Sequence, residues 1–429
     1  MFDGVSSSRI TELTLSGSFQ EMGQQYIAQA GDTILSQFQV MRRKWFDSLE
    51  PVELTEFQTK IQSLLMLCKQ NDVFYPNEMK RFMNGMAETE FAKNNNLSLD
   101  DFIMMDLALF LSAFHPKFLS EVKSSVDHCS YFAITEDRKV GLGRTLDWPK
   151  MPMTVLNQNL TILHLQCTEA NYPHQVTVMG PAGSISAFTI TNEKGLFWAH
   201  NSGTTAMHIK SPRFDRPYVA ADAVLKMFKC GDFETLKSSI VASPCGYPSI
   251  INIAGPGDYE MASIEACPID PRYPDNLAGF VNILHARGAK NAIHPEDNVK
   301  KRGYVATNLV RGDWEKILGK PPAENTPTYA RERKMVLEKK INQAHPEGKL
   351  MSILTSYLSG RFEGQDPEGV NKVWPPQAPF NDDRTTTHYS VAYVPCKQKL
   401  KVSVQMLEGE GHQEHGMPTP WKSIRTSRH

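Results

Sequence analysis

Cys129 is followed by two charged residues, Arg144 and Asp147, at a spacing that suits a thiol nucleophile. Runs of β-forming residues flank a turn at 136–138, and a hairpin built from them would return Arg144 and Asp147 to the neighbourhood of Cys129. A nearby cation lowers the pKa of a thiol, and a carboxylate holds an adjacent ammonium group in place. The pattern therefore indicates a nucleophilic cysteine, with an exposed Arg–Asp ion pair as the simpler alternative.

The remaining cysteines and the histidines carry no comparable pattern. The chain has seven cysteines: Cys68, Cys129, Cys167, Cys230, Cys245, Cys267 and Cys396. No two of them form a C-x-x-C pair, and an odd number in a chain of this size argues against a disulfide framework. Most are expected to be small buried apolar residues. The histidines are too dispersed to predict a metal site, so the sequence predicts no metal and no cofactor.

The predicted secondary structure changes from helices to strands along the chain, and the change falls next to Cys129. Residues 17–124 show apolar spacing typical of helices, as in 57–70. A capping box at Ser98–Asp101 opens a further helix, which Pro116 ends. From residue 129 onward short β-rich runs alternate with turns, so the helical leader ends just before Cys129.

The β-rich part predicts two sheets rather than one doubly wound sheet. Strands are expected at 130–135, 139–144, 160–166, 174–180, 184–190, 196–200, 249–255, 259–266, 279–286, 388–395 and 399–407. Helices are expected at about 215–241, 299–318 and 329–360, and a long surface loop at 361–385. A meander, intervening helices and a closing hairpin favour an α+β fold in which helices cover two sheets.

Length, charge and apolar runs limit the classes of protein to which this chain can belong. A chain of 429 residues is long enough for two or three domains or for one large domain with insertions. The formal net charge of −1 gives no support to nucleic-acid binding. No run reaches the roughly 18–20 apolar residues that a membrane span needs. Because residues 1–10 lack the features of a secretory signal, we expect a cytoplasmic protein, or a chain from which a segment has been removed.

Four segments resemble one family of hydrolases. Cys-Ser-Tyr-Phe at 129–132, followed by Gly-Arg-x-Leu-Asp-Trp at 143–148, resembles the mature start of the N-terminal-nucleophile cysteine hydrolases. That superfamily includes choloylglycine hydrolase, penicillin V acylase, the isopenicillin-N acyltransferase group and, more remotely, acid ceramidase. Residues 17–26 are similar to the opening of the acyltransferase-type precursors, and residues 190–201 and 253–266 are similar to segments of the bile-salt hydrolases.

The resemblance implies a fold and a domain organisation. The expected fold is a four-layer αββα sandwich, with two antiparallel sheets between helical layers, made as a precursor. Residues 1–128 would be a helical leader, or pro-region, that is cleaved and stays associated because its amphipathic helices need a partner surface. Residues 129–429 would form the catalytic domain, with a helical insertion at about 311–385. Whether the protein forms an oligomer is left open.

The resemblance also implies roles for individual residues. Cleavage of the 128–129 bond would make Cys129 the N-terminus, and its α-amine, with an ordinary pKa of about 7.7–8.0, would act as general base for its own thiol. Arg144 would favour the thiolate, and Asp147 would orient the α-ammonium. The side-chain amide of Asn201, together with a backbone N–H, would form the oxyanion hole.

Two further assignments depend on weaker matches. The second active-site asparagine of the family is best matched by Asn282, although the usual Thr-Asn-His is here Val-Asn-Ile. An arginine at the start of the next helix is matched by Arg302, although the serine often found three residues earlier is Val299. The alternatives are a turn-forming asparagine at a strand end and a solvated helical arginine.

Self-cleavage would take place in an unusual context, because the residue before the nucleophile is His128, where a small residue is common in the family. An imidazole could slow the N-to-S acyl shift by its bulk or assist it as an acid, and the sequence does not decide between the two effects.

The predicted activity is hydrolysis of linear amide bonds in small N-acyl substrates through a thioester on Cys129. The alternative enzyme activity is that of an acyltransferase, in which an amine rather than water attacks the thioester. The alternative from another class is a catalytically inactive binding protein on the same fold. A papain-like peptidase would need a histidine partner for the cysteine.

Overall fold

The computed structural model describes residues 10–112, 129–149, 160–202, 213–243, 246–247, 249–267, 280–284, 303–306, 350–358, 385–404 and 421–426. These residues form an α+β fold with two sheets and helices, as the helical and β-rich segments of the sequence predict. Within the described ranges, no helix has both the length and the apolar character to span a membrane.

The larger sheet, sheet A, has eight described strands. In spatial order they are β1 (Ile10–Gly17), β4 (Leu160–Cys167), β5 (Val176–Pro181), β6 (Thr189–Asn192), β7 (Phe197–Ser202), β8 (Ser249–Ala254), β9 (Met261–Cys267) and β10 (Phe280–Leu284). All neighbours are antiparallel except β1 and β4, which are parallel. The order of β4 to β10 follows the chain, as a meander does.

The second sheet, sheet B, contains the segment that begins at Cys129. Its described strands are, in spatial order, β11 (Gly303–Ala306), β2 (Ser130–Glu136), β3 (Lys139–Pro149), β12 (Thr385–Val394), β13 (Lys399–Val404) and β14 (Lys422–Arg425). The predicted hairpin is present: β2 and β3 pair from Ser130↔Thr145 to Glu136↔Lys139. The closing hairpin of β12 and β13 is joined by a short 3-10 turn, η5 (Pro395–Lys397).

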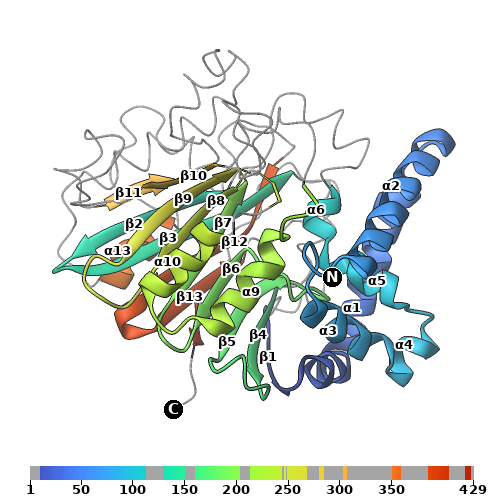
Figure 1. Ribbon diagram of the computed structural model, residues 1–429, viewed down its shortest axis with the longest axis horizontal. Helices are drawn as coiled ribbons and strands as arrows, with labels where there is room; N and C mark the ends of the chain where they lie inside the picture. The colour runs from blue at the N-terminus through green and yellow to red at the C-terminus, as the bar shows by residue number, and fades with distance from the viewer. Residues whose placement is uncertain are drawn as a thin grey trace, which may run out of the picture.

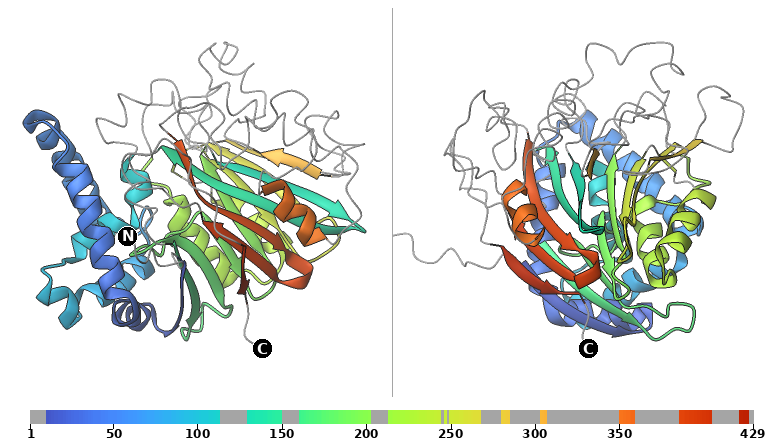
Figure 2. Two further views of the ribbon diagram at one scale, coloured as in Figure 1. Left: turned by 180° about the vertical axis from the view of Figure 1, so that it is seen from behind. Right: turned by 90° about the vertical axis from the view of Figure 1, so that its left-hand side faces the viewer.

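Helices cover both outer faces of the paired sheets. Helices α9 (Val219–Lys229) and α10 (Phe233–Ala242) lie over sheet A (Figure 1), and the turned view in Figure 2 places α13 (Leu350–Leu358) on the far side, against sheet B. Helix α13 approaches β3 closely because Gly141 faces it, and a Cβ on Gly141 would stand 2.7 Å from Cγ of Leu350. The layers therefore run helix, sheet, sheet, helix.

The space between the sheets is filled by the alternate side chains of each strand. Phe197 on β7 stacks on Tyr131 of β2 with ring centroids 6.3 Å apart, and on Tyr393 of β12 at 5.7 Å. Because side chains alternate across a strand, the neighbours of these residues point outward toward the helices. Arg144 on β3 belongs to the inward set.

The helices of the leader form a separate group beside the edge of sheet A at which β1 and β4 lie (Figure 1). Its helices are α1 (Phe19–Phe46), α2 (Pro51–Gln70), α3 (Asn77–Ala87), α4 (Glu90–Asn94), α5 (Leu99–Asp106) and α6 (Ala108–Ser112). Ser98 accepts a hydrogen bond from the backbone N–H of Asp101, as the capping box predicts. The helix predicted from Ser98 to Pro116 is interrupted at Leu107, which separates α5 from α6.

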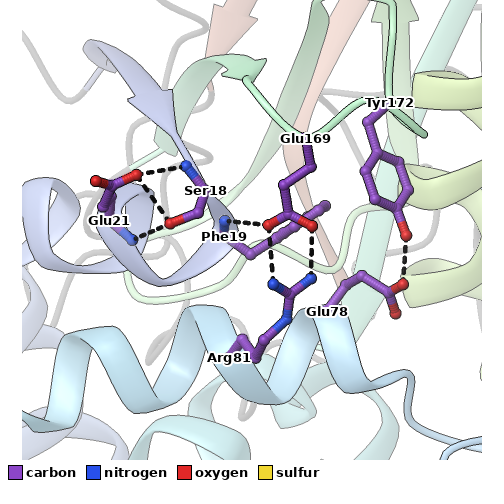
Figure 3. A network of polar contacts seen from close by, with 7 residues as sticks. All are labelled: Ser18, Phe19, Glu21, Glu78, Arg81, Glu169 and Tyr172. Atoms are coloured by element: carbon purple, nitrogen blue, oxygen red, sulfur yellow. Dashed lines mark hydrogen bonds and ion pairs between the residues drawn. The ribbon is translucent and has the colours of Figure 1, made fainter.

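Backbone pairing and a polar network join the leader to the sandwich. Strand β1, which no feature of the sequence predicted, pairs with β4 from Ile10↔Leu160 to Gly17↔Cys167. Glu169, just after β4, accepts hydrogen bonds of 2.9 and 2.8 Å from the two terminal nitrogens of Arg81 on α3 (Figure 3). The Arg81 guanidinium lowers the pKa of Glu169.

Two predicted elements are wrong. The helix predicted at 299–318 is contradicted at 303–306, where β11 pairs with β2, because an available sheet edge outweighs local helical spacing. The strand predicted at 184–190 is formed only from Thr189, since residues 182–188 turn away from β5. Of the helical insertion predicted at about 311–385, the structure describes α13 and Thr385, and Thr385 opens β12.

Candidate active site

Cys129 stands at the start of the β2–β3 hairpin and is buried, with 1 % of its surface exposed. The hairpin register places Arg144 opposite Tyr131, two residues beyond the cysteine. Nη2 of Arg144 lies 3.8 Å from Sγ of Cys129. A local hairpin thus brings the thiol and the guanidinium together.

Arg144 crosses from sheet B to the backbone of sheet A. Its side chain is completely buried. Nη1 donates to the carbonyl of Phe188 at 2.5 Å and to the hydroxyl of Thr189, and Nη2 donates to the carbonyl of His200. Within the described part of the chain its partners are thus carbonyls, a hydroxyl and a thiol, none of which carries a fixed negative charge.

Thr189 and Tyr389 support this arrangement from the two sheets. The Tyr389 hydroxyl on β12 lies 2.8 Å from Oγ1 of Thr189 and 3.3 Å from the carbonyl oxygen of Met179. Burial raises the pKa of Tyr389, and the nearby Arg144 opposes that rise. Tyr389 therefore stays a neutral phenol and holds Thr189 against the guanidinium.

His200 is a buried neutral histidine behind the site. Its Nε2 lies 3.0 Å from Oγ of Ser249, and its ring stacks on Phe188 at 4.9 Å between centroids. Burial, and then the charge of Arg144, hold the pKa of His200 well below its usual value. Its backbone carbonyl accepts from Arg144, so its side chain helps to set the position of that acceptor.

The His200 pKa predicts how stability depends on pH. Because the folded pKa is lower than the unfolded one, the unfolded chain binds the proton more readily, and the free energy of unfolding falls as the pH drops below about 6.5. The slope from this group approaches about 1.4 kcal/mol per pH unit. Urea unfolding of wild type and His200→Gln between pH 8 and 5 should differ by that slope; parallel curves would contradict the assignment.

Asn201 follows His200 on β7 and faces the space between the sheets. It is fully buried, and its Nδ2 donates a long hydrogen bond of 3.3 Å to the carbonyl of Ala306 on β11. Ala306 pairs with Tyr131, so the amide reaches the strand that begins beside Cys129. The amide group predicted as an oxyanion-hole donor therefore reaches from sheet A to sheet B, and its acceptor Ala306 lies opposite Tyr131, two residues after Cys129.

A row of directly opposed residues runs from Asn201 across sheet A. Asn201 pairs with Ile250, Ile250 with Glu265, and Glu265 with Asn282 on β10. Opposed residues share one face of a sheet, so Asn201, Glu265 and Asn282 lie on the face turned toward sheet B. Glu265 is buried, which gives this inner face a polar character that periodicity alone did not predict.

The other predicted site residues are placed only in part. Asp147 lies on β3 with its backbone paired to Thr387, and its side chain is outside the described part of the chain. The same is true of the Asn282 side chain, and Arg302 lies wholly outside the described residues. The helix in which Arg302 was expected is contradicted at Gly303–Ala306, which form β11.

The segment 190–201 contains an asparagine with a structural role. In the segment 190–201, Asn192 donates through Nδ2 to the carbonyls of Met227 and Cys230 at 3.0 and 2.9 Å, which joins the turn after β6 to the end of α9. Its Oδ1 accepts from the backbone N–H of Leu196. Among the described residues, no group of three or more histidine, cysteine, aspartate or glutamate side chains could hold a metal ion.

Sequence reasoning missed Phe188, Thr189, His200 and Tyr389. Their contributions are backbone carbonyls and hydroxyls that meet Arg144 from other strands. No spacing in the chain signals such contacts, since they depend on how the two sheets face each other.

No protein-family model matches the chain, and no curated protein sequence matches it. Among solved structures it is similar to a Caenorhabditis elegans N-acylethanolamine-hydrolyzing acid amidase ortholog, at 14% identity and a TM-score of 0.38, over 62% of this chain and 93% of that one. It is also similar to penicillin V acylase from Agrobacterium tumefaciens, at 13% identity and a TM-score of 0.36, over 64% of this chain and 82% of that one.

A third similar structure is a mutant of the conjugated bile acid hydrolase from Clostridium perfringens, at 13% identity and a TM-score of 0.34, over 69% of this chain and 92% of that one. These likenesses concern the fold.

Proposed function

We propose that the protein is an N-terminal-nucleophile hydrolase that cleaves linear amide bonds of small N-acyl substrates through a thioester on Cys129. The observation that carries the proposal is the buried Arg144 guanidinium, 3.8 Å from the sulfur, whose other acceptors among the described residues are neutral. A buried cation without a paired anion is costly, and a thiolate would supply that anion. The site therefore favours the nucleophilic form of the cysteine.

The proposed reaction begins with self-cleavage of the bond before Cys129. The freed α-amine then takes the thiol proton, sulfur adds to the carbonyl carbon of the substrate, and the amine product leaves with the proton as the C–N bond breaks. Water hydrolyses the resulting thioester, which releases a carboxylic acid and restores the thiol. These steps need no histidine, in keeping with the low pKa of His200, which keeps that ring neutral.

The remaining roles complete the proposal. Asn201 would exchange its long contact with Ala306 for a hydrogen bond to the developing oxyanion. Asp147 would orient the α-ammonium, and Asn282 and Arg302 would contact the substrate. Residues 1–128 would be the pro-region of a four-layer αββα N-terminal-nucleophile fold and would stay bound after cleavage, as the β1–β4 pairing supports.

The test is to trap the acyl-enzyme. Purified protein is mixed briefly with a panel of N-acyl amides that differ in acyl chain and amine, quenched in acid, digested and examined by mass spectrometry. We expect the mass of the acyl group on the peptide that carries Cys129, together with release of free amine. Repeating the reaction with an added acceptor amine distinguishes hydrolysis from acyl transfer, because transfer yields a new amide in place of the acid.

Cys230→Ala is the matched control, because Cys230 is a buried thiol outside this site whose pKa is raised by burial. It should acylate Cys129 as wild type does. A protein that binds these amides but neither acylates Cys129 nor releases amine would instead be a binding protein on this fold.

A further inference from the structure

Asp106, the last residue of α5, is a buried carboxylate that joins the leader to the catalytic part of the chain. From the catalytic side, the backbone N–H groups of Ile185 and Ser186 both donate to Oδ1 at 2.7 Å, and the hydroxyls of Ser184 and Ser186 donate at 2.9 and 2.5 Å. From the leader, the Tyr75 hydroxyl donates to Oδ2 at 2.7 Å. All five of these donors are neutral.

These bonds shape the segment 182–188 between β5 and β6. Gly183 at its start has a φ of +88° and packs so closely on α5 that a Cβ there would stand 2.3 Å from Cε of Met105. The backbone N–H of Gly183 also donates to the Tyr26 hydroxyl of α1 at 2.9 Å. Because Asp106 takes two consecutive backbone donors of this segment, they are not available for pairing along β5.

The segment ends at the acceptors of Arg144. Phe188 lies two residues after Ser186, and its carbonyl accepts both from Arg144 at 2.5 Å and from the backbone N–H of His200 at 2.9 Å. The hydroxyl of Thr189, the next residue, accepts from the same guanidinium nitrogen. The position of these acceptors therefore depends on how the segment is held.

We propose that Asp106 is a positioning residue for the active site: it fixes segment 182–188, which fixes the Phe188 and Thr189 acceptors, and these aim Arg144 at the sulfur of Cys129. The inference rests on the proposed function. Its consequence is that a residue on the leader side of the 128–129 bond sets the electrostatics of the thiol, so the leader would be part of the working enzyme after cleavage. A carboxylate is suited to this task, because charge-assisted hydrogen bonds are about twice as strong as neutral ones.

The simpler reading is that Asp106 only attaches the leader. A second leader contact distinguishes the two interpretations, because the hydrogen bonds of Glu169 go to Arg81 and to the backbone N–H of Phe19, both on the leader (Figure 3). Glu169→Gln weakens attachment alone, and Asp106→Asn, nearly identical in shape, weakens attachment and the hold on Arg144 together.

The measurement is the rate of alkylation of Cys129 by iodoacetamide as a function of pH, followed on the Cys129 peptide by mass spectrometry. For Asp106→Asn we expect the midpoint of the curve of alkylation rate against pH to rise by about one pH unit, which means about tenfold less thiolate at neutral pH. We also expect a matching loss in kcat at nearly unchanged KM. Glu169→Gln should keep the wild-type midpoint and kcat even where its melting temperature is lower.

A normal midpoint and kcat in Asp106→Asn, with only a lower melting temperature, would overturn the proposal. If Asp106→Asn fails to fold, Ser186→Ala takes its place, since it keeps the carboxylate and removes one of its donors from the segment; an unchanged midpoint there has the same meaning. Failure of the proposed function would look different: no amide would be cleaved by wild type, yet the midpoint would still depend on Asp106 and Arg144.

Discussion

Replacing Cys129 by alanine should leave a single uncut chain of 48.3 kDa, whereas the wild-type protein should yield two fragments that meet between His128 and Cys129. The physical reason is that, in the proposed reaction, cleavage begins with attack of this thiol on the preceding carbonyl, and an alanine side chain has no group that could attack. Intact-protein mass spectrometry gives the masses directly. Amide hydrolysis should be abolished in the same variant, because the sulfur also carries the acyl group.

Cys68→Ala is the control for this experiment. Cys68 on α2 is as buried as Cys129, but burial raises its pKa to about 12, so it is not a nucleophile at neutral pH. This variant should be cut and active. Cys129→Ser adds a finer test, since a hydroxyl can carry out the acyl shift slowly and should give partial cleavage. An active wild-type protein that stays uncut would show that the freed amine is not the base.

Replacing Arg144 should have the second-largest effect, on both reactivity and stability. Without the cation, the midpoint of Cys129 alkylation should rise by about 1–3 pH units, the range that one nearby opposite charge accounts for. Arg144→Met also removes the guanidinium donor from the carbonyl of His200, and removes one of the two donors of the Phe188 carbonyl, which should cost about 1–3 kcal/mol of unfolding free energy. Alkylation rates against pH and urea unfolding measure the two effects.

Arg144→Lys separates charge from geometry. The ammonium keeps the charge, but it cannot serve two carbonyls, a hydroxyl and the thiol from the directions that the planar guanidinium uses. We expect a smaller rise in the midpoint and most of the loss in stability. Arg81→Met is the matched control, because its ion pair with Glu169 is partly solvent-exposed, at 36% and 28%, and should be worth only about 0–1 kcal/mol. Equal effects at both positions would contradict the special role of Arg144.

The architecture was largely predictable because its signals are local. Alternating apolar residues predicted most strands of both sheets, and Asn192–Gly195 and Glu136–Arg138 marked the turns between them. Residues 303–306 and 184–188 were assigned wrongly for the opposite reason. Pairing with β2 makes a strand of the first, and the Asp106 carboxylate removes the second from the sheet.

The proximity of Cys129 and Arg144 could be predicted from local signals, because one hairpin of β-forming residues around a tight turn sets their register. The surroundings of the guanidinium could not be predicted in this way, because they depend on how distant segments pack together. Its acceptors at Phe188, Thr189 and His200 come from the opposite sheet, and Asp106, which holds their segment, comes from the leader. Such contacts arise from the packing of distant segments in a common core, and neither periodicity nor spacing along the chain encodes which carbonyl will face a buried charge.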